Sequence, residues 1–170
     1  LICDVNSHIY NYEGGGISFN SGVQAKLIQG DEGRLSAEKI EAFINADFDW
    51  LTRTSLVSLE NTINRAGGSY YTTEQINPIS VLCKNKNLGL HLDGARIFNA
   101  LIETGDSPKE LGKCFDSISI CLSKGLGAPI GSLLISSQTF IKKARKVRKV
   151  FGGGMRQAGI LAAAGIYALK

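Results

Sequence analysis

The chain has 170 residues, of which 44% are hydrophobic and 20% are charged, and its formal net charge is +4 at pH 7. This length and apolar content suffice for one ordinary globular core, and the mildly basic balance suits an anionic ligand while falling short of a nucleic-acid-binding composition. No apolar run of about 18 residues and no leader pattern occurs. We therefore find no support for membrane insertion or secretion and expect a cytoplasmic protein.

Strand and helix patterns alternate in the first part of the chain. Residues 1–6 read as a buried strand, and His8 follows it before an aromatic and glycine-rich loop. Residues 23–28 predict an edge strand, Ser36 predicts the cap of a helix that runs to about Asn45, and residues 54–61 predict another strand. The polar Glu60 and Asn61 should then lie at the end of that strand.

The same alternation continues through the second part. Asn77-Pro78 predicts the start of a helix, because proline is tolerated at the first helical position. An apolar strand ends at Asp93, a helix follows Arg96, and a short helix is expected from Pro108 to about Gly112. Residues 116–122 and 131–136 read as two strands so closely connected that they should be antiparallel.

Two helical patterns end the chain. The first contains a basic run over residues 142–149, with an apolar face predicted to be buried that consists of Ile141, Ala144, Val147 and Phe151. A solvated helix face explains this run better than a nucleic-acid patch. The second is an apolar helix over residues 158–169, opened by Arg156-Gln157.

This order of elements predicts the fold class. Strand, helix and strand recur at βαβ spacing, which is typical of a mainly parallel sheet with right-handed crossovers. We expect an α/β fold in three layers, with helices on both faces of the sheet and one antiparallel strand.

The four cysteines predict neither a metal site nor a disulfide framework. Cys3, Cys83, Cys114 and Cys121 are scattered without CxxC spacing. Reduced and mostly buried thiols fit this pattern best. No metal ligands are predicted.

Two residues have surroundings that suit chemistry. Lys124 follows an apolar strand at the start of a small-residue loop, where a partly desolvated amine would lose its proton more easily and attack a carbonyl to form a Schiff base. Asp93 ends a strand, where open α/β sheets bind ligands. From these residues alone, an ordinary exposed loop lysine and a helix N-cap aspartate remain open readings.

Five blocks of sequence, taken together, resemble one family. They are Ser7 to Gly16 (SHIYNYEGGG), Leu59 to Thr62 (LENT), His91 to Arg96 (HLDGAR), Leu122 to Pro129 (LSKGLGAP) and Gly152 to Gly159 (GGGMRQAG). In this order they resemble pyridoxal-phosphate enzymes of the aspartate-aminotransferase fold (fold type I), and among these the low-specificity L-threonine aldolases of the beta-eliminating lyase/threonine aldolase family. The blocks extend over nearly the whole chain, which makes the resemblance specific.

The resemblance implies roles for three catalytic residues. Lys124 would hold pyridoxal 5'-phosphate as a Schiff base. Asp93 would pair with the pyridine nitrogen and keep it protonated, and His8 would stack on the ring and relay protons. The implied reaction is aldol cleavage of a β-hydroxy-α-amino acid, so that L-threonine or L-allo-threonine gives glycine and acetaldehyde.

Further binding residues are implied in the same way. Ser123 and Arg156 would contact the cofactor phosphate, while Arg96 and Asn61 would bind the substrate. The family is oligomeric, so a homodimer or homotetramer is expected. One position departs from the family pattern, because Ile63 stands where many threonine aldolases have a histidine, and this puts proton handling at the substrate hydroxyl in doubt.

The resemblance also predicts that residues 1–170 form most of a large cofactor-binding domain, with an N-terminal segment and a C-terminal small domain absent. The isolated piece is then expected to be inactive. Two other readings stay open: a different pyridoxal-phosphate lyase, acting by β-elimination or serine-type aldol cleavage, and an inactive module with a structural or interaction role.

Overall fold

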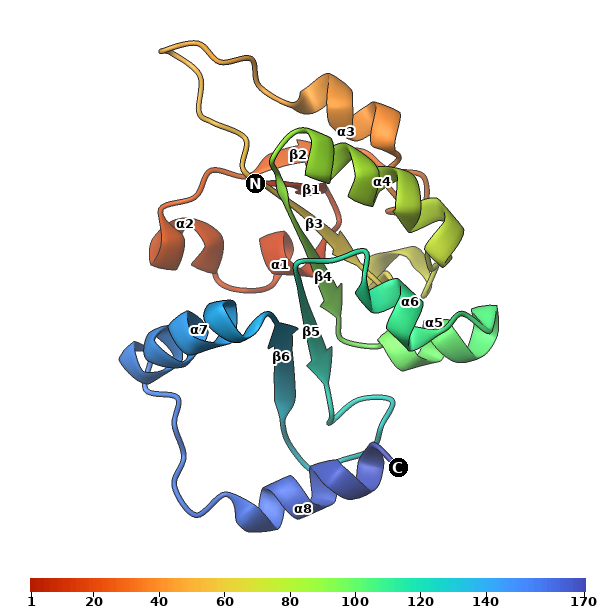
Figure 1. The fold of residues 1–170 in the computed structure, drawn as a ribbon, viewed down its shortest axis with the longest axis vertical. Coiled ribbons are helices and arrows are strands. Elements are labelled where there is room, and N and C mark those ends of the chain that lie inside the picture. The colour runs from red at the N-terminus through yellow and green to blue at the C-terminus, as the bar shows by residue number, and fades with distance from the viewer.

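One six-stranded sheet organises the computed structural model, which describes residues 1–170 (Figure 1). Its strands, in spatial order, are β2 (Lys26–Ile28), β1 (Ile2–Asp4), β3 (Leu56–Glu60), β4 (Gly89–Gly94), β5 (Ser117–Cys121) and β6 (Ser132–Ser136). All neighbouring pairs are parallel except β5 and β6, which are antiparallel. The predicted mainly parallel sheet with one antiparallel strand is therefore confirmed.

Helices lie on both faces of this sheet, as predicted. Figure 1 shows α3 (Ala37–Phe43), α4 (Thr73–Asn85), α5 (Ile97–Thr104) and α6 (Pro108–Gly112) on one side. The other side carries α1 (His8–Asn11), α2 (Gly16–Ser21) and α7 (Gln138–Val150), while α8 (Gly159–Ala168) lies beyond the connection between β5 and β6. A single 3₁₀ turn, η1 (Asn64–Ala66), follows β3.

The two faces of the sheet differ in chemistry. Side chains alternate along a strand, and in β4 Leu90 and Leu92 are buried among the helices α3 to α6, while His91 and Asp93 face the other way and stay partly exposed. The sheet thus has one apolar face that forms the core and one polar face.

The start of α4 corrects a prediction. The helix begins at Thr73 rather than at Asn77-Pro78, and Pro78 lies inside it. Thr72 and Gln75 form a capping box: the Thr72 side chain accepts the Gln75 N–H, and the Gln75 side chain accepts the Thr72 N–H. Because this box supplies the start signal, the proline costs the helix only the one hydrogen bond that its missing N–H would have made.

The burial of α7 also differs from the prediction. None of its residues is buried. Of the predicted face, Ile141 and Ala144 are half-buried, whereas Val147 and Phe151, the residue after the helix, are 53% and 60% exposed. Within this chain the main contact of α7 is with β6, so its apolar side chains have little to pack against. No helix of the structure combines the length and the apolar character that crossing a bilayer requires.

Candidate active site

The carboxyl ends of β3, β4 and β5 meet at one edge of the sheet and surround a cavity of about 340 Å³. Register explains why they meet, because Glu60 pairs with Asp93 and Asp93 with Ser119 on neighbouring parallel strands. The lining residues are His8, Ile9, Glu13, Glu60, Asn64, Asp93, Ala95, Arg96, Ser119, Ile120, Cys121, Lys124 and Ser132. This volume lies near the lower limit for small-molecule sites.

Four predicted site residues line this cavity from different segments. Lys124 follows β5, Asp93 lies in β4, Arg96 precedes α5, and His8 is the first residue of α1. One cavity therefore presents an amine, a carboxylate, a guanidinium and an imidazole.

Asp93 is held by its own turn. Its Oδ1 accepts the backbone N–H of Ala95 at 3.2 Å, a hydrogen bond that fixes the carboxylate at the strand end. The N-cap of α5 is Arg96 and not Asp93. The alternative reading of Asp93 as a helix cap therefore does not describe this structure.

His8 is oriented by two acidic residues. Its backbone N–H donates to Oε2 of Glu60 at 2.8 Å, and its Nε2 lies 3.3 Å from Oε1 of Glu13. The imidazole also contacts the Tyr12 ring, with the ring centroids 5.0 Å apart. The side chain is 34% exposed, so it remains accessible from the cavity.

Lys124 lies in a tight loop. The Gly127 N–H donates to the Lys124 carbonyl at 2.9 Å, and the Ala128 N–H donates to the Leu122 carbonyl at 2.9 Å. The lysine is exposed, unlike the partly desolvated amine that the sequence suggested.

Three other predicted residues lie outside the lining of the cavity. Asn61 is fully buried, and its side chain donates to the Tyr71 carbonyl and accepts the Tyr71 N–H, so it supports the loop after β3 instead of facing a substrate. Ser123 is exposed and contacts Cys121, with 3.4 Å between Oγ and Sγ. Arg156 is exposed in the connection between α7 and α8.

Ile63 has a structural place of its own. Its side chain is 1% exposed in the hydrophobic core and does not line the cavity. Among the residues that do line the cavity, Glu13 was given no role although it stands in the first of the five blocks, and Glu60 was predicted only to lie at the same edge as Asp93.

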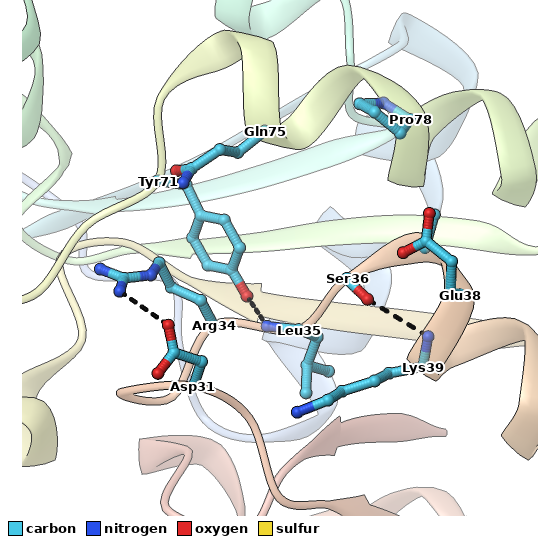
Figure 2. Close-up of a pocket in the computed structure, with 10 residues that line it drawn as sticks. Asp31, Arg34, Leu35, Ser36, Glu38, Lys39, Tyr71, Gln75 and Pro78 are labelled. Carbon is cyan, nitrogen blue, oxygen red and sulfur yellow. Dashed lines mark hydrogen bonds and ion pairs between the residues drawn. The ribbon is translucent and has the colours of Figure 1, made fainter.

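A second cavity, of about 300 Å³, lies between α3, α4 and the turn after β2 (Figure 2). Its polar groups are already paired. Arg34 contacts Asp31 at 3.1 Å, and the Tyr71 hydroxyl accepts the Leu35 N–H, as Figure 2 shows. Burial raises the pKa of Tyr71 well above its ordinary value, so this hydroxyl stays neutral. The first cavity is therefore the better candidate for chemistry.

Comparison with known proteins gives a consistent picture. Residues 1–170 match the family model described as beta-eliminating lyase. The chain is 45% identical over 173 residues to low-specificity L-threonine aldolase 1 of Arabidopsis thaliana, covering 100% of this chain and 48% of that protein. It is 46% identical over 165 residues to low specificity L-threonine aldolase of Escherichia coli K12, covering 96% of this chain and 49% of that protein.

Among solved structures, threonine aldolase from Leishmania major superposes with a TM-score of 0.86 at 26% identity, covering 99% of this chain and 49% of that one. The chain thus spans about half the length of the curated relatives it matches.

Proposed function

Because the chain belongs to the beta-eliminating lyase family, we propose that it forms most of the large cofactor-binding domain of a longer enzyme that uses pyridoxal 5'-phosphate. The reaction we propose is aldol cleavage of a β-hydroxy-α-amino acid such as L-threonine or L-allo-threonine, giving glycine and an aldehyde. The observation that carries this proposal is the shared cavity of Lys124, Asp93, His8 and Arg96.

The donor set of the cavity fits the proposed cofactor. Lys124 has the amine with which the cofactor's aldehyde would form a Schiff base. Asp93 has the carboxylate that would pair with the protonated ring nitrogen of the cofactor. When bound, pyridoxal phosphate supplies the electron sink for carbon–carbon cleavage, which no protein side chain can provide. Ser123 and Arg156 are proposed to contact its phosphate.

The remaining roles belong to the residues around the substrate. Arg96 presents a planar cation suited to hold the substrate carboxylate. His8, with Glu13 beside its Nε2, is placed to accept and return a proton, since a carboxylate at hydrogen-bond distance orients an imidazole. A homo-oligomeric enzyme is part of the same proposal.

The test uses the full-length protein. Adding pyridoxal phosphate should produce an absorbance band near the edge of the visible range, and threonine should then give equal amounts of glycine and acetaldehyde. Lys124→Ala should lose both the band and the products, because Lys124 is the only lysine that lines the cavity. Lys109→Ala, an exposed lysine of α6, is the matched control.

Two results would contradict the proposal. A normal band in Lys124→Ala would mean that another residue holds the cofactor. Ammonia and a keto acid in place of glycine would identify β-elimination as the reaction, which is the nearest alternative among pyridoxal-phosphate lyases.

A further inference from the structure

Glu60, the last residue of β3, accepts two backbone N–H groups from separate segments of the chain. Its Oε2 accepts from His8 at 2.8 Å, and its Oε1 accepts from Asn64 at 2.9 Å. Both distances are short, as expected when the acceptor is charged. Glu60 is half-buried and takes part in none of the chain's ion pairs.

The two N–H groups begin two very short elements. His8 is the first residue of α1 and Asn64 the first residue of η1, and these contain four and three residues. The first N–H groups of a helix have no partner within it, and helices this short are not stable by themselves. The Glu60 carboxylate therefore fixes the first residues of α1 and η1, two segments too short to be stable by themselves.

Each segment presents a residue of the proposed active site. His8 lines the cavity directly, while Oδ1 of Asn64 accepts a hydrogen bond from Nη1 of Arg96 at 3.3 Å. We propose that Glu60 is a positioning residue that sets His8 and, through Asn64, Arg96 at the cavity. This inference rests on the proposed function, which gives His8 and Arg96 their roles in the reaction.

This role requires both carboxylate oxygens of Glu60. A carboxylate has two acceptor oxygens, whereas a glutamine amide has one acceptor oxygen and a donor nitrogen. Glu60→Gln can therefore keep one of the two N–H groups and must lose the other. Glu60→Ala loses both, so the two variants should form a graded series.

The first measurement does not depend on activity. In the full-length protein with its histidines and asparagines labelled with ¹⁵N, the amide hydrogens of His8 and Asn64 should exchange with solvent about tenfold faster in Glu60→Ala than in the unmodified protein. Glu60→Gln should accelerate one of them. Glu110→Gln, which alters an exposed carboxylate on α6 that pairs with Lys113, should change neither.

The second measurement is steady-state cleavage of threonine. Glu60→Ala should lower kcat/KM by about 100-fold, since displacements of about 1 Å in a catalytic group have effects of this size. Part of the loss should appear as a higher KM, from Arg96, and part as a lower kcat, from His8. Glu60→Gln should lose less, and Glu110→Gln nothing.

Unchanged kcat/KM in both Glu60 variants would overturn the inference. So would faster exchange spread over the whole chain, which would reveal a general role in folding. If the unmodified protein cleaves no β-hydroxy amino acid, the proposed function fails, and the two amide signals still decide whether Glu60 holds both segments.

Discussion

Gly94 is the residue that allows the strands carrying Asp93 and Lys124 to lie close together. It follows Asp93 at the end of β4, and a Cβ placed on it would lie 2.9 Å from the backbone oxygen of Ser119 and 3.2 Å from Cβ of Ile97. Neither atom is at the end of a flexible side chain. At this scale, the absence of a single methyl group sets the geometry of the proposed site.

Gly94→Ala should therefore destabilise the protein by about 1–3 kcal/mol, because the backbone must move to make room. Chemical denaturation measures this as a lower midpoint. Gly112→Ala is the matched control: it lies in α6 with nothing within 4 Å of the added Cβ. That change should be neutral or stabilising by up to about 1 kcal/mol. Equal effects of the two substitutions would contradict the argument.

At the scale of the element, α4 shows how local signals compete. A proline in the sequence suggested a helix start, but the capping box of Thr72 and Gln75 begins the helix five residues earlier than Pro78. The neighbouring Thr73 N–H donates to the Asp106 carboxylate at 2.6 Å, which anchors the same end to the segment before α6. The first turn of α4 is thus specified by side chains on both sides of its start.

Removing the cap should show this directly. Thr72→Ala deletes the oxygen that accepts the Gln75 N–H and should cost about 1 kcal/mol. Thr72→Ser keeps a hydroxyl and should stay within about 0.5 kcal/mol of the unmodified protein. Thermal unfolding of the two variants makes the comparison. A loss as large in the serine variant as in the alanine variant would point to the methyl group instead of the cap.

At the scale of the whole molecule, one face of the sheet forms the hydrophobic core and the other carries the polar residues of the proposed site. The helices α3 to α6 bury the apolar face, while the polar face carries Glu60, His91 and Asp93. His91 is a half-buried titratable group of that face that the proposed reaction does not use, and its Nδ1 lies 2.8 Å from Oγ of Ser117. Burial lowers the pKa of His91 below its ordinary value of 6.5, and the nearby Asp93 only partly opposes this.

The lowered pKa predicts acid sensitivity. Below about pH 6.5, His91 becomes protonated in the unfolded chain but stays neutral in the folded chain. The free energy of unfolding should therefore fall as the pH drops from there toward the pKa of His91 in the folded protein. Above it, both states are neutral and the contribution vanishes. Urea denaturation at about pH 7.5 and about pH 5.5 should show a smaller difference for His91→Gln than for the unmodified protein. Equal differences would show that His91 is not the sensor.

The sequence by itself determined the order of strands and helices, the parallel sheet with its antiparallel end, and the identity of Lys124, Asp93, His8 and Arg96 as candidates. The strands and the surroundings of Lys124 and Asp93 follow from local pattern, because strand ends, caps and short loops are specified by neighbouring residues. His8 and Arg96 became candidates through the family resemblance. Only the tertiary structure decided that Asn61 is buried, that Ser123 and Arg156 are not among the residues lining the cavity, and that no residue of α7 is buried. It also decided that Glu60 joins α1 to η1, since a contact between residues 52 positions apart depends on how the whole chain packs.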